Sequence, residues 1–156
     1  MSGTQVQAGI TRHARTRARR LAMQALYQWD LSGLELNRIE TQFLENENFQ
    51  GVDREYFTEI LHQVPACLDE IEAGLAGSLN RPLTEVDPVE RSILRIAAYE
   101  LSLRPDIPCR VVINEAVQLA RKFGADQGHA FINGVLDHAA RTIRKQEMKT
   151  TGKSTA

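Results

Sequence analysis

Residues 87–101, DPVERSILRIAAYEL, decide the fold of this chain. Asp87 is a good helix N-cap, Pro88 suits the first helical position, and Glu90 completes a capping-box-like arrangement. Apolar residues then recur over a wide arc as far as Leu103. The pattern predicts a helix that is central to the molecule, because a helix apolar on most of its surface must be covered by others.

Helical periodicity continues on both sides of this stretch. Towards the C-terminus it predicts a helix at about 110–123 and a last helix that begins at Asp126, its expected N-cap. Towards the N-terminus we expect helices at about 12–33, 34–47 and 53–64, followed by a break or kink at Pro65 and a further apolar period up to Gly77. No segment alternates with period two for long enough to predict a strand.

The expected fold is therefore all-α, with about seven helices in two small bundles. We expect a single domain over residues 12–145, with halves of about 12–79 and 80–145. The short connections predict that neighbouring helices pack antiparallel. Residues 1–11 and the polar tail 146–156 show no periodic pattern, so both are expected to be disordered.

The bulk composition is that of an ordinary globular protein, with 42% apolar and 25% charged residues. The apolar runs are too short for a membrane span, and the N-terminus has no apolar signal-peptide core, so we expect no membrane association and no secretion. Cys67 and Cys109 lie far apart and form no C-x-x-C pair. They are expected to be reduced thiols in a cytoplasmic protein.

Charge is distributed unevenly along the chain, although the net charge is only −1. No acidic residue precedes Asp30, whereas the segment 30–137 carries 19 acidic and 9 basic residues. The end of the chain, from residue 138, is basic again. Basic ends on an acidic body indicate a polyanionic partner, and the body could equally dock a basic protein.

Five arginines crowd the start of the first expected helix: Arg12, Arg15, Arg17, Arg19 and Arg20. Their guanidinium groups can bind phosphates bidentately and stack on bases. The alternative, a solvated helix start, is weakened because cations near a helix N-terminus oppose its macrodipole. We therefore interpret the cluster as a nucleic-acid patch, which by itself does not distinguish RNA from DNA.

Four aromatic side chains could stack on unpaired bases. Trp29 and Phe131 fall on apolar stripes, so core packing is the stronger expectation for both. Tyr27 lies off the stripe of its helix, and Phe123 precedes a helix-ending Gly124. Those two are the better candidates for a surface role.

Signals of catalysis are few. Glu59 and His62 match the Glu-x-x-His half-site of di-iron bundles, but no second copy of that motif occurs. The chain has no P-loop, no G-x-S-x-G and no cysteine–histidine spacing typical of a metal site. We therefore expect no enzyme, no cofactor and no bound metal.

Three blocks of sequence together resemble a known pattern: RTRARRLAMQALYQW at 15–29, DPVERSILRIAAYEL at 87–101, and VINEAVQLARKFG at 112–124. The third continues as FINGVLD at 131–137. In this order and spacing they resemble the NusB family of bacterial antitermination proteins over roughly residues 12–145. The resemblance implies two perpendicular three-helix bundles and a non-catalytic, RNA-binding protein.

The resemblance also implies particular partners. They are single-stranded boxA RNA of ribosomal RNA transcripts and NusE, a small-subunit ribosomal protein that doubles as a transcription factor. The pair would join other Nus factors on RNA polymerase and suppress termination of transcription.

Residues are assigned by position in the same way. The family's RNA-contacting positions correspond to Arg15, Arg17, Arg19, Gln24, Tyr27, Phe123, Gln127 and Phe131, and Glu90 corresponds to the acidic residue that meets NusE. Thr16 stands where many relatives are basic, and Arg20 where some are acidic, so the register of the cluster stays open. Arg12 and Arg20 therefore remain candidates alongside the other three arginines.

Two alternatives remain. The same fold occurs as the N-terminal domain of certain ribosomal RNA cytosine-5 methyltransferases, but we find no Rossmann-like catalytic domain in residues 1–156 and expect none. A helical scaffold that binds only proteins would show no salt-dependent affinity for polynucleotides.

Overall fold

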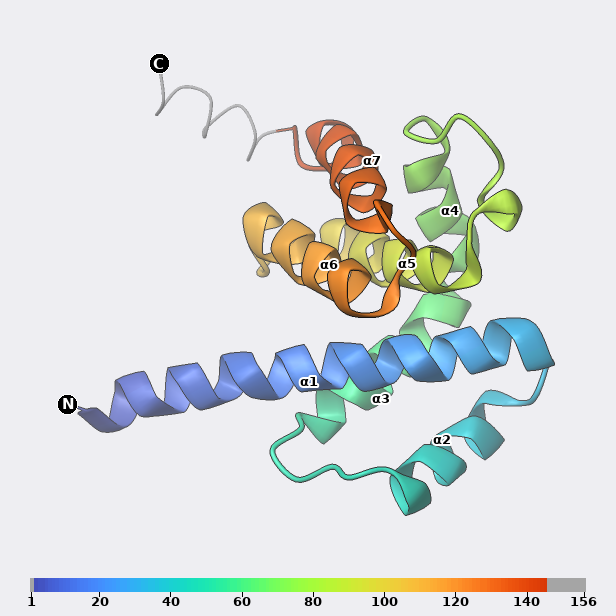
Figure 1. Cartoon of the computed structure of the whole chain (residues 1–156). Coiled ribbons are helices and arrows are strands. Elements are labelled where there is room, and N and C mark those ends of the chain that lie inside the picture. The colour runs from blue at the N-terminus through green and yellow to red at the C-terminus, as the bar shows by residue number, and fades with distance from the viewer. Residues whose placement is uncertain (1, 146–156) are drawn as a thin grey trace. The chain divides into compact units, whose positions relative to one another are not determined.

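The computed structural model describes the backbone of residues 2–145 and the side chains of residues 11–145. Within that range the chain forms seven α-helices, one short 3-10 turn and no strands, which confirms the all-α prediction. The helices divide into two compact units, Met1–Ala66 and Cys67–Ala156. Figure 1 shows the elements of each unit.

Unit 1 contains α1 (Ser2–Ser32), α2 (Leu36–Asn46) and α3 (Arg54–Ala66). The long helix α1 packs against both α2 and α3. The core of the unit is largely aliphatic and aromatic, and Phe49 in the α2–α3 loop meets Phe57 edge-on with ring centroids 5.0 Å apart. Asp53 caps α3 as expected, since its Oδ1 accepts from the backbone N–H of Tyr56 at 3.0 Å.

Unit 2 contains α4 (Leu68–Ala76), the 3-10 turn η1 (Leu83–Glu85), α5 (Pro88–Leu103), α6 (Cys109–Phe123) and α7 (Gly128–Ile143). Helices α4, α6 and α7 all pack against α5. Every residue from Glu90 to Leu101 is buried, so α5 is the central helix that the sequence predicts. Its start is also as expected: Asp87 Oδ2 accepts from the N–H groups of Val89 and Glu90 at 3.1 and 3.2 Å.

The structure differs from the sequence-based prediction at the N-terminus. Helix α1 begins at Ser2, not near Arg12, so residues 2–11 are helical in the structure instead of lacking secondary structure. This extension is physically inexpensive, because each residue added to an existing helix gains a backbone hydrogen bond without a new nucleation step. No proline interrupts the segment. The expected disorder of the tail 146–156 concerns residues outside the described range.

The boundary between the two units also differs from the expected one. It falls between Ala66 and Cys67, after the break at Pro65, and not near residue 80. Helix α4 belongs to unit 2 because it packs against α5 and α7. At Gly74 the contact is so close that an added Cβ would lie 3.3 Å from Cδ1 of Ile143. The apolar period runs on through Pro65, so the sequence alone does not indicate this partition.

Two buried arginines hold loops in unit 2. The Arg144 side chain donates to the carbonyl oxygens of Leu101 and Ile107 at 2.8 Å, Arg104 at 2.9 Å and Glu100 at 3.0 Å. It thereby caps the C-terminal end of α5 and the loop that follows. Arg91 similarly donates from Nη1 to carbonyl oxygens around η1, among them those of Thr84 and Val86 at 3.0 Å.

Candidate nucleic-acid interface

The five arginines of α1 do not share one environment. Arg12 and Arg17 are exposed, Arg15 and Arg20 are half-buried, and Arg19 is only 3% exposed. Arg12 also lies ten residues after Ser2, the first residue of α1. The expectation that the cluster opposes the helix dipole is therefore wrong, because that effect is confined to the first turn.

Arg15 and Arg19 are held by α3. Their Cζ atoms lie 5.0 and 5.4 Å from the ring centroid of Tyr56, within the range of a cation–π contact. The Nε of Arg15 also lies 3.8 Å from Oδ2 of Asp53, but it is buried without a hydrogen bond. These two guanidinium groups are therefore positioned by unit 1 itself.

Arg17 braces the α2–α3 loop. Its Nη1 donates to the carbonyl oxygen of Gly51 at 3.2 Å while the side chain stays exposed. Gly51 has a φ of 76°, and a Cβ added there would lie 3.0 Å from that Nη1. The left-handed backbone favours glycine at this position, and the missing Cβ also leaves room for the Arg17 side chain.

Four residues form one stripe along the open side of α1: Arg20, Gln24, Tyr27 and Leu31. Their spacing of four, three and four residues places them on the same helical face. Tyr27 is 36% and Leu31 54% exposed, which confirms the surface position expected for Tyr27. The side chain of Arg20 takes part in no hydrogen bond or ion pair within the described residues.

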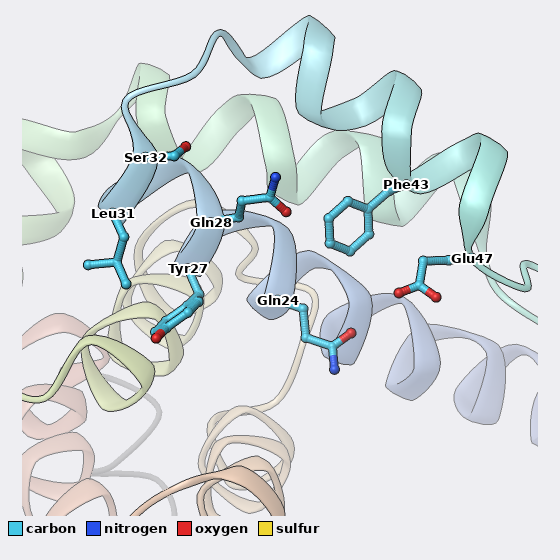
Figure 2. Close-up of a pocket in the computed structure, with 7 residues that line it drawn as sticks. All are labelled: Gln24, Tyr27, Gln28, Leu31, Ser32, Phe43 and Glu47. Atoms are coloured by element: carbon cyan, nitrogen blue, oxygen red, sulfur yellow. The ribbon is translucent and has the colours of Figure 1, made fainter.

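A hollow of about 490 Å³ lies beside this stripe, between α1 and α2. Figure 2 shows Gln24, Tyr27 and Leu31 lining it from α1, with Phe43 from α2 and Glu47, the C-cap of α2. The lining combines apolar faces with amide and carboxylate groups. Such a lining can hold the flat face of a base or side chain and also hydrogen-bond to its edge.

The remaining aromatic candidates lie in unit 2, around the α6–α7 loop. Phe123 ends α6 and is half-buried, with Nζ of Lys122 5.8 Å from its ring centroid. Gln127 is exposed and is the N-cap of α7 in place of the expected Asp126, with a left-handed φ of 64°.

Phe131 is half-buried and not fully in the core, and the Cζ of Arg81 lies 5.2 Å from its ring centroid. Trp29 in α1 is likewise only half-buried.

Glu90 is an internal residue, only 6% exposed. Its carboxylate accepts a hydrogen bond from the backbone N–H of Ala125, and a Cβ at Gly128 would lie 3.1 Å from its Oε2. Glu90 therefore ties the start of α5 to the loop that carries Gln127. Little of its side chain is left for direct contact with another protein.

Burial, together with the negative charge of Asp87, raises the pKa of Glu90 above its ordinary value of 4.5. The Ala125 N–H and the charge of Arg81 oppose this rise in pKa. Because the folded state then holds the proton more tightly than the unfolded chain, Glu90 should stabilise the fold as pH falls from above its raised pKa towards 4.5. That contribution is lost again as pH rises through the raised pKa.

The variant Glu90→Gln should remove this pH dependence, because the amide keeps an acceptor for the Ala125 N–H but does not titrate. We expect the variant to be at least as stable as the wild type at pH ~7.5. As the pH falls towards ~4.5, the stability of the wild type should increase relative to that of the variant. Thermal unfolding across this range measures the difference. If the stability of the two proteins changed with pH in the same way, the raised pKa of Glu90 would be contradicted.

His62 of the Glu-x-x-His motif lies beside Glu40 of α2. Nε2 of His62 lies 3.0 Å from Oε1 of Glu40, whose Oε2 accepts from the Thr58 hydroxyl at 3.2 Å. Among the side chains of residues 11–145, no three His, Cys, Asp or Glu residues are grouped so that they could hold a metal ion. No helix in the described range is long and apolar enough to cross a membrane.

The chain is similar in sequence to known proteins. A family model described as "NusB family" matches residues 16–141. The chain is 52% identical to the transcription antitermination protein NusB of Pseudomonas entomophila (strain L48), over 86% of this chain and 81% of that protein. It is 46% identical to the protein of the same name from Nitrosococcus oceani, over 87% of this chain and 91% of the relative.

A solved structure is similar as well. The chain matches T. maritima NusB with a TM-score of 0.72 and 26% sequence identity, over 86% of this chain and 96% of that one. The range matched by the family model, 16–141, contains every candidate residue except Arg12 and Arg15.

Proposed function

The chain belongs to the NusB family, and on that premise we propose that it is an RNA-binding transcription antitermination factor. The relatives at about half identity carry antitermination in their names. The proposed role requires binding and assembly and no bond-breaking step. A factor of this kind would work in the cytoplasm, on transcripts as they are made.

One observation carries the proposal: the helix that carries the arginines also carries a stripe suited to unpaired bases, and Arg20 is the first residue of that stripe. Arg12, Arg17 and Arg20 supply charge that no carboxylate in the described residues neutralises through an ion pair. Gln24 and Tyr27 follow on the same helix beside a hollow. Phosphate-binding arginines next to an exposed aromatic ring are typical of proteins that bind single-stranded RNA.

We further propose that the RNA is the boxA element of ribosomal RNA transcripts and that NusE is the protein partner. The segment 30–137, with 19 acidic and 9 basic residues, is complementary in charge to a basic ribosomal protein. Other Nus factors and RNA polymerase would complete the assembly. The assignment of Glu90 to the NusE contact is retained in an indirect form, through the loop that this residue holds.

The test is a titration of the protein with boxA-like and scrambled single-stranded RNA of the same length, with and without NusE, at one salt concentration. We expect NusE to raise the affinity for the boxA-like RNA by about 5- to 150-fold, the usual range of coupling between two sites, and to raise it less for the scrambled RNA. Fluorescence anisotropy of labelled RNA measures all four dissociation constants.

Equal affinities for the two RNAs in the presence of NusE would contradict the boxA assignment. Binding of NusE without any binding of RNA would instead support a protein-only scaffold. The substitution Glu90→Lys adds a control, because it should weaken NusE binding by disturbing the α6–α7 loop. An unchanged heterodimer in that variant would refute the role of Glu90.

A further inference from the structure

Arg81 lies in the loop between α4 and η1, a segment that carries no recognisable sequence motif. Its side chain is exposed, and its Cζ lies 5.2 Å from the ring centroid of Phe131 in the first turn of α7. The aromatic face holds the guanidinium in one orientation. Such a side chain loses less conformational freedom when a ligand binds than an unconstrained arginine side chain does. The structure therefore presents a preorganised cation on an exposed surface of unit 2.

The charge of Arg81 remains available to a ligand. Within the described residues Arg81 takes part in no ion pair or hydrogen bond. Its electrostatic neighbour is Glu90, whose pKa it lowers, but that carboxyl is buried and is hydrogen-bonded to the Ala125 N–H. The buried Glu90 carboxylate therefore does not occupy the exposed guanidinium in an ion pair.

Arg81 also borders a hollow of about 490 Å³ in the same unit. Leu79, Pro82 and Leu83 give the hollow apolar walls, and Thr84 adds a hydroxyl. Glu72, which also lines the hollow, is paired with Arg95 at 3.1 Å and so does not add an unpaired negative charge. A volume in this range accommodates a small planar ligand, and apolar walls suit the faces of a base more than its edges.

We propose that Arg81 is a further RNA-binding residue, stacked on Phe131 and contacting one nucleotide of single-stranded RNA whose base lies at the adjoining hollow. The proposal rests on the proposed RNA-binding function and extends it to a loop outside the family-like sequence blocks. Arg81 thereby adjoins the candidate residues of this end of α7, since Gln127 is the N-cap of the helix and Phe131 lies in its first turn. Arginine planes and aromatic rings are the groups on which unpaired RNA bases stack.

The experiment compares three variants with the wild type, using a boxA-like single-stranded RNA at several salt concentrations. Arg81→Ala should weaken binding by about 5- to 30-fold, because one stacking contact and one charge are lost. It should also make the slope of log K against log salt shallower by about 0.7, the contribution of one phosphate contact. Arg81→Lys should keep the slope but recover only part of the affinity, because an ammonium group does not stack.

Phe131→Leu provides the third variant and a double-mutant cycle. If Arg81 acts while stacked on Phe131, the losses in Arg81→Ala and Phe131→Leu should be clearly less than additive in the double variant. Additive losses would overturn the stacked arrangement. The matched control is Arg110→Ala, which removes an equally exposed arginine near the opposite end of α6 from Phe123 and should bind as the wild type does.

The inference and the proposed function fail in different ways. If the wild type binds the RNA but Arg81→Ala binds as tightly as Arg110→Ala, the role of Arg81 is refuted and the proposed function stands. If the wild type itself does not bind, the proposed function is refuted, and the inference with it. Far-ultraviolet circular dichroism of each variant confirms that the helices are retained.

Discussion

Replacing Arg12, Arg17 and Arg20 together with alanine is expected to weaken binding of single-stranded RNA by about 100-fold. Each guanidinium supplies one charge-assisted contact, and a net loss of about 1 kcal/mol for each contact multiplies to that factor. Alanine is the best helix former, so α1 should keep its helix content. Anisotropy titrations measure the affinity, and far-ultraviolet circular dichroism measures the helix content.

The control variant carries Arg38→Ala, Arg110→Ala and Lys145→Ala. These three side chains are also exposed, and their loss changes the net charge of the protein by the same amount. A site on α1 predicts near-wild-type affinity for this control. Equal losses in the two triple variants would instead mean that RNA responds only to overall charge.

Arg15 and Arg19 are excluded from the triple variant for a structural reason. Arg19 is 3% exposed, and both guanidinium groups lie over the ring of Tyr56. Their removal would change the packing of α1 on α3 as well as the charge. A loss of RNA binding in such variants would not separate RNA contact from folding. The side chains of Arg12 and Arg20 make no hydrogen bond or ion pair within the described residues, and that of Arg17 makes one exposed hydrogen bond to the Gly51 carbonyl, so the triple variant disturbs the packing much less.

Arg144→Met is expected to lower the free energy of unfolding by about 3–5 kcal/mol, the largest stability effect of any single substitution considered. The Arg144 side chain is 8% exposed and donates to four carbonyl oxygens at the end of α5 and in the following loop. Methionine fills a similar space but removes all four donors. The Glu100 and Arg104 oxygens keep the backbone N–H groups of Arg104 and Ile107 as donors, whereas the Leu101 and Ile107 oxygens lose the Arg144 donor, and unpaired buried polar groups are costly. Urea unfolding measures the loss.

The matched control for Arg144 is Arg141→Met in the same helix. Arg141 is exposed and pairs only with Asp137, at 3.0 Å, so its loss should cost less than about 1 kcal/mol. The loss of stability in Arg144→Lys should lie between those of the two methionine variants, because three ammonium donors on a flexible stem cannot reproduce the planar guanidinium group. Equal stability of the Arg144→Met and Arg141→Met variants would refute the capping role.

Local signals in the sequence were sufficient to predict much of the fold. Asp87 and Pro88 predicted the start of α5 correctly because an N-cap and an N1 proline act within one turn of helix. Burial along α5 followed from its wide apolar arc. The exposure of Tyr27 followed from its angle on α1.

Tertiary contacts were not predictable from these patterns. Arg144 and Arg19 belong to basic segments and look like surface charge, yet each is buried by partners distant in the sequence. Only the fold brings Tyr56 of α3 under the arginines of α1. The same holds for Arg81, which no motif marks and which Phe131 orients from fifty residues away.

The most direct test of the central claim, that the arginines of α1 hold the RNA backbone, is the salt dependence of RNA binding by the wild-type protein. Three engaged arginines of α1 predict a slope of about −2 in log K against log salt, at about −0.7 for each phosphate contact on a single strand, and a contact by Arg81 would add about another −0.7. A slope near zero, or no detectable binding even at low ionic strength with NusE present, would contradict the account.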